Sequence, residues 1–289
     1  MRAEPSWLPA NWSLATDNNA LGFTTTCFGG ASGGAFAHNN MRFTIGDEPR
    51  AVTANRAKLL ASISSHFNTN FADTHNRAEA NSLAAHSRQA VSLQWLDQVH
   101  GNECVYVSAD SLAGTPQADA AWTDEPGLGI AIQTADCVPI LITDSKATIV
   151  GAAHAGWRGL VANIISNLVT SMPANPKDLV AWIGPCIGRK NFEVGEDVWS
   201  VILAILPDAV FKHPKDPAKR LVDLVAIARW QLQQCAVGSI SSADICTYAC
   251  VDFYSHRYAC HQAFIESGSA IGTTGRMASV VVCAPKLTQ

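Results

Sequence analysis

Residues 128–144 read LGIAIQTADCVPILITD, and residues 148–160 read TIVGAAHAGWRGL. The first stretch is apolar on both faces except near its middle, which is typical of a strand buried inside a sheet. We predict one buried strand over 128–144, with a functional position at the polar interruption. The second stretch predicts a strand that ends at His154, then a glycine-flanked turn and a helix.

Other elements are predicted on both sides of this centre. Apolar residues at helical spacing predict a helix over 47–67, another near 198–206 and a third over 220–237 that stops at Gly238. β-prone runs predict further strands. These lie after Leu21, on both sides of His100, in 178–188, near 244–255 and in 278–284.

The order of these elements indicates the fold class. Strands and helices are mixed without a steady alternation, which favours an α+β fold with mixed sheets and helices outside them. No repeat of fixed period and no break in composition is visible, so we expect one domain over residues 1–289. Residues 68–90 are polar and poor in large apolar side chains, and we interpret them as a surface insertion or loop.

Composition limits the classes of function. Hydrophobic residues make up 48% of the chain and charged residues 15%, while the net charge is −4 and no block of Lys or Arg occurs. These values exclude a strongly basic binding surface for nucleic acid or anionic membrane and favour a small-molecule substrate. The nine cysteines are scattered without a CxxC pair, which indicates reduced thiols and a cytoplasmic protein. No apolar stretch is long enough to span a membrane.

Three residues predict a metal site. His100, Cys137 and His154 lie at predicted strand ends or at the polar interruption. One thiolate and two imidazoles suit zinc, and three protein ligands leave a fourth position open for catalysis. Their wide spacing is weak evidence by itself, since a buried cysteine often acts as a small hydrophobe and a turn histidine is often only hydrogen-bonded.

Several ordered motifs strengthen this hypothesis. They resemble the YfiH family, also described as multicopper polyphenol oxidoreductase or laccase-domain proteins and as laccase-domain purine nucleoside phosphorylases. The motifs are GGASGG at 29–34, ANR at 54–56, QVHG at 98–101, TADCVPIL at 134–141, HAGWRG at 154–159, GPCIG at 184–188 and TGR at 274–276.

The resemblance implies a fold, a metal and an activity. The implied fold is layered α/β/β/α, shared with cytotoxic necrotizing factor toxins, and the family's metal ligands fall on His100, Cys137 and His154. The implied activity is zinc-dependent phosphorolysis of adenosine, inosine and methylthioadenosine, together with adenosine deamination. The implied partners are a purine nucleoside and phosphate; oligomeric state does not follow from the sequence.

Candidate catalytic residues follow from this chemistry. Asp136 would transfer a proton during deamination, or would orient the backbone or a ligand histidine instead. Phosphorolysis requires a cationic clamp for phosphate, and Arg158 at a helix start is the first candidate. Arg56, Arg257 and Arg276 are further candidates. Cys186 in GPCIG is interpreted as part of a tight turn rather than a nucleophile.

Alternative functions remain open. A copper-dependent polyphenol oxidase is chemically conceivable with one copper, but a multicopper enzyme needs about ten histidines, and this chain has nine without an HxH motif. A metal-dependent amidase that edits peptidoglycan precursors would use the same metal. A purely structural metal normally has four protein ligands.

The chain departs from the family pattern at two places. Thr26 and Cys27 precede the glycine-rich segment where an arginine is usual, and SHRYA at 255–259 replaces a more basic run, with Tyr258 in an arginine's place. We also expect a longer loop over 258–273. Substrate preference is the property that these departures affect.

Overall fold

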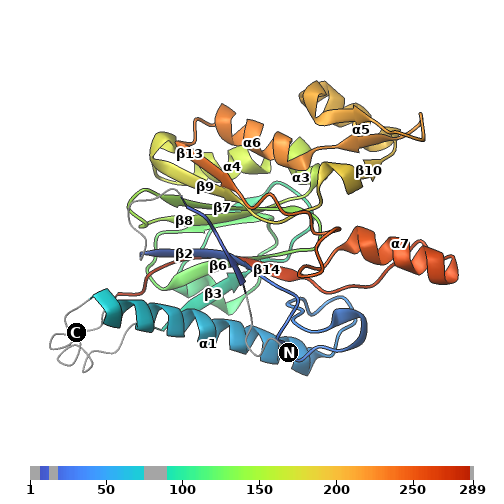
Figure 1. The fold of residues 1–289 in the computed structure, drawn as a ribbon. Helices are drawn as coiled ribbons and strands as arrows, with labels where there is room; N and C mark the ends of the chain where they lie inside the picture. Colours follow the sequence, from blue (N-terminus) through green and yellow to red (C-terminus); the bar gives the residue numbers. More distant parts are fainter. Residues whose placement is uncertain (1–6, 13–18, 75–89, 287–289) are drawn as a thin grey trace.

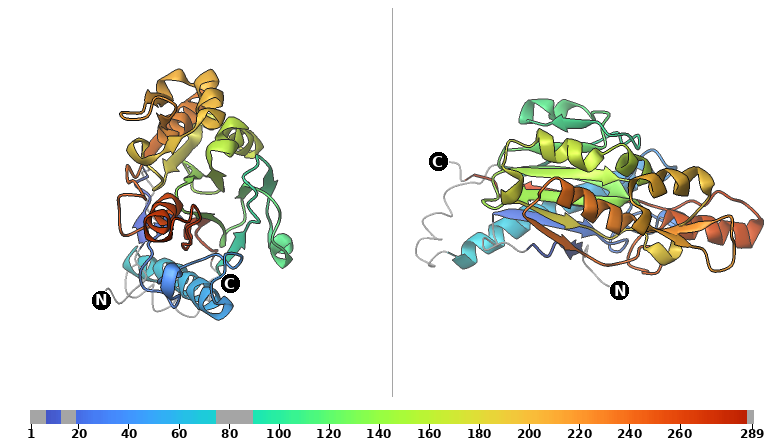
Figure 2. Two further views of the ribbon diagram at one scale, coloured as in Figure 1. Left: turned by 90° about the vertical axis from the view of Figure 1, so that its right-hand side faces the viewer. Right: turned by 90° about the horizontal axis from the view of Figure 1, so that it is seen from above.

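The computed structural model describes residues 7–12, 19–74 and 90–286. Two large sheets pack face to face, with helices on both outer sides (Figures 1 and 2). This arrangement confirms the predicted α+β fold with mixed sheets and outer helices, in the order α/β/β/α.

One outer layer is a five-stranded sheet covered by a long helix. The helix is α1 (Pro49–Thr74), and its Leu59, Ile63 and Phe67 pack on the sheet against side chains such as Phe23 and Val280. The sheet has the order β1 (Trp7–Pro9), β2 (Ala20–Thr25), β14 (Met277–Cys283), β6 (Leu128–Thr134) and β3 (Ser92–Trp95).

The other large sheet has six strands and carries several helices on its outer face (Figure 1). Its helices are α3 (Trp157–Val161), α4 (Ile164–Ser171) and α6 (Leu224–Gln234). Its order is β13 (Ser239–Ser242), β9 (Leu179–Ile183), β7 (Val138–Asp144), β8 (Val150–Ala155), β5 (Ala120–Thr123) and β4 (Cys104–Tyr106).

The burial of both faces of β6 and β7 explains why residues 128–144 contain so few polar side chains. In β7, Ile140 and Ile142 face the helices, whereas Leu141 faces the five-stranded sheet. In β6, Ile130 and Ile132 face the six-stranded sheet. Both faces of each strand are therefore buried, and period-two patterning produces a continuous apolar run.

Leu141 allows the contact between the sheets to be tested. It is fully buried in the cluster that joins them, at 0% exposure. We expect Leu141→Ala to lower the free energy of unfolding by about 2–5 kcal/mol, because burial is lost and a cavity remains. Urea unfolding followed by circular dichroism measures this. A loss below about 1 kcal/mol would show that the two sheets do not depend on this contact.

A smaller unit extends from the six-stranded sheet. It contains α5 (Glu196–Ile205) and a three-stranded sheet in the order β10 (Glu193–Val194), β12 (Arg220–Val222), β11 (Val210–Lys212). Helix α7 (His256–Ser267) projects from the body nearby (Figure 1). Short 3₁₀ turns complete the described chain, at Gly34–Phe36, Ala109–Ala113, Pro176–Asp178, Arg189–Asn191 and Pro207–Ala209.

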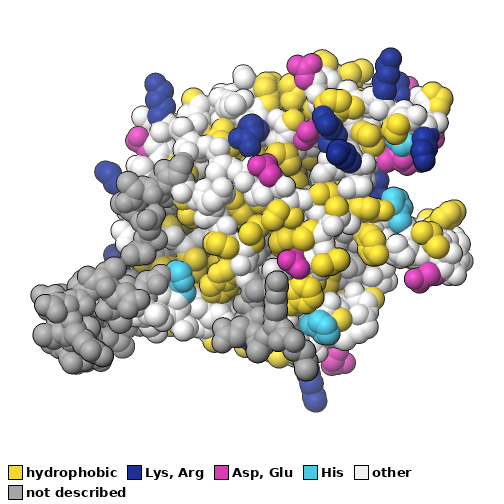
Figure 3. All heavy atoms as spheres, viewed as in Figure 1, with side chains coloured by type: hydrophobic (Ala, Val, Ile, Leu, Met, Phe, Trp, Pro, Cys, Tyr) yellow, Lys and Arg dark blue, Asp and Glu magenta, His cyan; other side chains and the backbone are white. Residues whose placement is uncertain are grey.

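Figure 3 shows the side chains on one face of the molecule. Most Lys and Arg side chains of this face lie over its upper part, among acidic and hydrophobic side chains, and hydrophobic side chains show on the projecting α7. That face offers no continuous basic surface. Within the described part of the chain, no helix has the length and apolar character needed to cross a bilayer.

The central stretch differs most from the prediction. Residues 128–144 form two strands, β6 and β7, in different sheets. The polar interruption is the turn between them, where Asp136 has a positive φ of 89°. Likewise β3 and β4, which flank His100, lie in different sheets. Periodicity could not reveal the break, because both strands are buried on both faces.

Two predicted loops are partly or largely helical. The segment 68–90 was expected to be a surface insertion or loop, but α1 continues to Thr74, and residues 75–89 lie outside the described part. The expected loop over 258–273 is mostly α7. Its cap signals were present in the sequence: Ser255 accepts the Tyr258 N–H, and Gly268 ends the helix at φ 71°.

Two further boundaries were wrong. Arg220–Val222 pairs as β12, so the helix predicted over 220–237 begins only after Asp223, which caps the Ala226 N–H. The strand expected near 244–255 is absent from that described segment. The strand is instead β13, because Ser239–Ser242 pairs in parallel with β9.

Candidate metal centre

Two of the segments through which the chain crosses between the large sheets carry a predicted ligand. His100 lies between β3 and β4, with a positive φ of 62°, and Cys137 lies between β6 and β7. His154 is the second-last residue of β8, which pairs with β7. The fold therefore brings three distant positions to one place.

The three side chains form one cluster. One donor atom from each of His100, Cys137 and His154 lies within 4.8 Å of the others. The two imidazole rings are 4.7 Å apart and nearly perpendicular, at 80°. Within the described residues this is the one His/Cys/Asp/Glu group with such geometry. A Cβ at Gly156 would lie 3.0 Å from the Cys137 Sγ, so the glycine leaves room beside the thiol.

Asp119 organises both histidines, and the sequence reasoning missed it. Its carboxylate accepts the backbone N–H groups of Val99, His100 and Gly101, at 3.2, 3.0 and 2.6 Å. It also bonds the His154 Nδ1 at 2.7 Å. The Nε2 of His154 is thereby left for the cluster, as in the carboxylate–histidine pairs of many metal sites. Asp119 is fully buried.

The electrostatics of the cluster favour a thiolate. Burial alone would raise the pKa of Cys137, but the neighbouring His154 and His100 outweigh it and lower the pKa to about 6. Burial would lower the pKa of His154, but the Cys137 thiolate and Asp119 raise it to about 9. A cation held by the thiolate and the imidazoles would compete with protons for the same donor atoms.

The donor set fits a divalent metal. One thiolate and two imidazoles, with a buried carboxylate fixing one imidazole, match the ligand types and outer contacts of catalytic zinc sites. His100, Cys137 and His154 are the residues that would hold such an ion.

Asp136 lies beside the cluster, with both carboxylate oxygens engaged. Oδ1 accepts the Thr247 hydroxyl at 2.7 Å, and Oδ2 accepts the Arg257 backbone N–H at 2.6 Å. Its carbonyl accepts the Ile187 N–H at 2.9 Å. These contacts tie the Cys137 turn to the start of α7 and to the GPCIG segment, which favours the orienting role over proton transfer.

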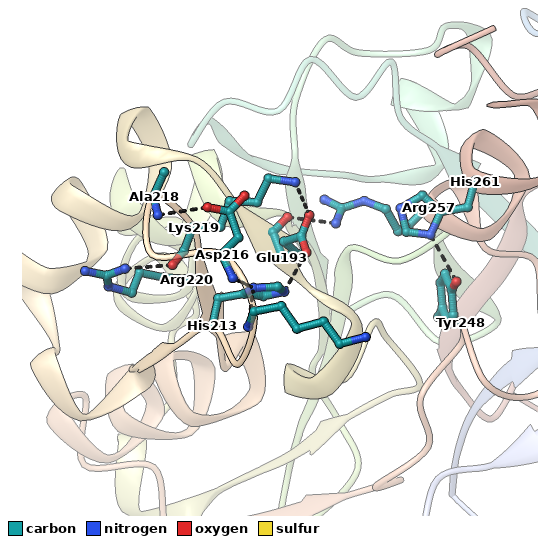
Figure 4. A network of polar contacts seen from close by, with 10 residues as sticks. Glu193, His213, Asp216, Ala218, Lys219, Arg220, Tyr248, Arg257 and His261 are labelled. Atoms are coloured by element: carbon teal, nitrogen blue, oxygen red, sulfur yellow. Dashed lines mark hydrogen bonds and ion pairs between the residues drawn. The ribbon is translucent and has the colours of Figure 1, made fainter. Parts of the chain in front are cut away.

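The candidate arginines lie in different places. Arg158 is exposed and stacks over Trp157 at 4.4 Å. Arg257 points toward β10, where its Nη1 donates to the Glu193 carbonyl at 2.7 Å (Figure 4). That glutamate also pairs with His213 and Lys219. Arg257 therefore contacts Asp136 through its backbone N–H, whereas its guanidinium donates to the Glu193 carbonyl.

Arg56 lies in a separate cavity of about 370 Å³. Its Nε and Nη2 donate to the Met41 carbonyl at 2.9 and 2.7 Å, and its guanidinium lies over Trp95 and Phe43, at 3.7 and 4.6 Å from the ring centres. Burial lowers the pKa of Arg56 to about 10. This arginine is held in place by backbone and aromatic contacts.

Arg276 is the arginine that the fold brings toward the cluster. It precedes Met277, which pairs with Thr134 at the edge of the Cys137 turn. Burial and Arg42 lower the pKa of Arg276, whereas Cys137 and Asp136 act to raise it. The TGR motif marks this residue in the sequence, but only the β14–β6 pairing places it near Cys137.

The remaining singled-out residues have structural contacts. Cys186 is buried, which raises the pKa of its thiol and agrees with a packing role in the turn. Cys27 is buried and donates to the Val251 carbonyl at 3.3 Å.

Asn55 accepts the Ala31 N–H at 2.7 Å, and a Cβ at Gly30 would lie 2.3 Å from the His38 carbonyl oxygen. The backbone is therefore tightly packed at Gly30. Tyr258 is half exposed and packs on Tyr248.

Comparison with known proteins gives a consistent result. The model of the family described as multi-copper polyphenol oxidoreductase laccase matches residues 64–284. A Pseudomonas aeruginosa protein named purine nucleoside phosphorylase is 33% identical over 96% of this chain and 98% of its own length. The Escherichia coli purine nucleoside phosphorylase YfiH is 32% identical, over 89% of this chain and 91% of its own.

Solved structures agree. A Neisseria meningitidis protein superposes with a TM-score of 0.78 at 32% identity, covering 96% of this chain and 99% of the other. YlmD of Geobacillus stearothermophilus superposes with a TM-score of 0.74 at 28% identity, covering 92% of each chain.

Proposed function

Since this chain belongs to the multi-copper polyphenol oxidoreductase laccase family and is similar over nearly its whole length to purine nucleoside phosphorylases, we propose that it is a zinc-dependent phosphorylase of purine nucleosides. The observation that carries the proposal is the cluster of His100, Cys137 and His154. Zinc held there would supply a Lewis acid with an open coordination position.

Phosphorolysis makes defined demands on the protein. A phosphate oxygen forms a bond to C1′ of the ribose, the bond from C1′ to the base breaks, and the base leaves with a proton. Positive charge develops at C1′, so phosphate must be held close to it by cations. We propose that Arg276 provides this clamp. It directly precedes β14, whose first residue, Met277, pairs with Thr134 at the edge of the Cys137 turn.

The clamp can be tested against the earlier candidate. Arg276→Ala is expected to raise the KM for phosphate about 10- to 100-fold, since a charge-assisted hydrogen bond is worth about 1.5–3 kcal/mol. Arg158→Ala is expected to change it less than about threefold, because Arg158 is exposed over Trp157. Steady-state kinetics with varied phosphate measures both. If Arg158→Ala raised the KM for phosphate more than Arg276→Ala did, the phosphate clamp would be assigned to Arg158.

The principal experiment measures the reaction. The purified protein is incubated with inosine and phosphate, and ribose 1-phosphate and hypoxanthine are followed, with metal content determined by elemental analysis. Equal amounts of both products in the presence of phosphate are expected. Release of hypoxanthine without ribose 1-phosphate would contradict phosphorolysis. Failure with inosine, adenosine and methylthioadenosine alike would contradict the substrate class.

Adenosine deamination belongs to the same proposal and is followed as inosine formed without phosphate. Because both Asp136 oxygens accept hydrogen bonds, we propose a positioning role for Asp136. Copper-dependent polyphenol oxidation and peptidoglycan editing are the alternative functions. A multicopper oxidase needs several metal-binding groups, whereas the described residues contain one such group. The nine free thiols support the expected cytoplasmic location.

A further inference from the structure

We propose that the cavity lined by Phe43, Trp95, Thr115 and Gln133 binds the purine base, and that the Gln133 side chain recognises its edge. This inference rests on the proposed function for the identity of the substrate. The cavity has a volume of about 370 Å³, and Arg42 and Arg56 also line it. That volume is within the usual range for small-molecule sites.

The first observation is an unsatisfied polar group. Gln133 is 6% exposed and lines the cavity, and its Oε1 accepts no hydrogen bond from any residue in the described part of the chain. Leaving a buried amide oxygen unpaired is unfavourable, because its hydrogen bonds to water are lost without replacement. The side chain lines the cavity, so a turn of its amide would present this oxygen to a ligand there, and a ligand that donates to it would recover that cost.

The second observation is a wall of stacked planar side chains. The guanidinium of Arg56 lies 3.7 Å from the ring centre of Trp95 and 4.6 Å from that of Phe43. Both Nε and Nη2 of Arg56 already donate to the Met41 carbonyl. The stacked planar groups are therefore fixed in orientation, and a planar heteroaromatic ring packs well against such a surface.

The third observation connects this cavity to the metal centre. Gln98 clamps the two segments that run from the cavity to the cluster: its Oε1 accepts the Gln133 N–H at 2.7 Å, and its Nε2 donates to the Gln133 carbonyl at 2.8 Å. Gln98 lies two residues before His100, and Gln133 lies four before Cys137. Four extended residues span at most about 13 Å, so one nucleoside can reach from the base cavity to the cluster.

The chemistry of a glutamine side chain suits both kinds of purine. Its amide offers one donor and one acceptor, the pair that recognises the adjacent N6 and N7 of adenine. Rotation of the amide presents the donor to a 6-oxo group instead. A glutamine in this position is therefore expected to admit both 6-amino and 6-oxo purines while leaving the ribose end to other residues.

Binding of the free base tests the inference without turnover. Calorimetric titration of the purified protein with hypoxanthine and with adenine is compared for wild type, Gln133→Leu and Gln117→Leu. Gln117 is exposed beside the cavity and does not line it. We expect Gln133→Leu to raise the Kd of both bases and the KM for inosine about tenfold or more, because a buried partner is lost, and Gln117→Leu to change neither.

A second variant covers the case in which Gln133→Leu does not fold. Phe43 is 40% exposed, so Phe43→Ala is expected to fold and to weaken hypoxanthine binding severalfold. Unchanged base binding in the folded cavity variants overturns the inference, even if inosine phosphorolysis continues. Binding of inorganic phosphate that depends on Gln133, with base binding unaffected, also overturns it. Gln133-dependent base binding in a protein that cleaves no nucleoside supports the cavity assignment and contradicts the proposed function alone.

Discussion

Replacing Cys137 with alanine is expected to remove stoichiometric metal and to lower kcat/KM for inosine by about 1,000-fold or more. The thiolate is the one anionic donor in the cluster, and the remaining imidazoles of His100 and His154 would hold a divalent ion weakly. Loss of a Lewis acid worth several kcal/mol corresponds to a change of this size. Elemental analysis and steady-state kinetics measure the two effects.

The matched control is Cys235→Ala, which removes a half-buried thiol at the end of α6, away from the cluster. Metal content and activity are expected to match the wild type. Full metal occupancy in Cys137→Ala would remove Cys137 from the ligand set. Loss of metal with unchanged phosphorolysis would separate the metal from catalysis and contradict the proposed mechanism.

Asp119→Ala is expected to weaken metal binding about 10- to 100-fold and to lower the free energy of unfolding by about 3–5 kcal/mol. The first effect follows because His154 loses the carboxylate that fixes its orientation. The second follows because the backbone N–H groups around His100 lose a buried acceptor. Competition with a chelating dye and urea unfolding measure these quantities.

Asp144→Ala separates the two effects. Asp144 is also a buried carboxylate that accepts backbone N–H groups, from Thr148 at 2.6 Å and Ile149 at 3.0 Å, but it does not contact a histidine. We expect it to destabilise the fold and to leave metal affinity unchanged. Equal loss of metal affinity in both variants would show that the Asp119 effect is general unfolding.

The pH dependence of stability has a definite sign. Burial would raise the pKa of Asp119, but hydrogen bonds from His154 and Gly101 outweigh it and lower the pKa below its ordinary value. The folded state therefore favours the carboxylate, and its contribution to stability is full above the unfolded pKa and is lost as the pH falls through the lower folded value. Acid unfolding of Asp119→Ala is expected to show a smaller decline in that range than the wild type.

Most elements of the fold could be predicted where one periodic signal dominated. The amphipathic part of α1, the strand ending at His154 and the strand before GPCIG were recovered, as was the layered α+β arrangement. The errors arose where tertiary pairing selects the structure of a short segment. Arg220–Val222 joins a helical pattern in sequence but pairs with β10 and β11 in space.

At the candidate site, too, some residues could be predicted from the sequence and others could not. His100, Cys137 and His154 were named from ligand chemistry and ordered motifs, and the fold brings their donor atoms together. Asp119 was not identified, and Gln133 was included only as one of the polar residues of the interruption, without a role of its own. Each is one polar residue beside an apolar segment, and no spacing rule connects Asp119 to His154 or Gln133 to Gln98. Arg158 and Arg257 were ranked by their sequence positions, which do not specify the direction of a long side chain.

The run at 128–144 illustrates what each level of information determined. The sequence by itself determined that these residues are buried, that the polar interruption is a special position and that Cys137 suits a metal. Only the tertiary structure decided that the interruption is a reversal between two sheets and that Asp136 closes it with contacts to Thr247 and α7. The reason is physical: burial and ligand type are properties of individual side chains, whereas the meeting of distant donors depends on strand pairing that contributes free energy only after the chain has folded.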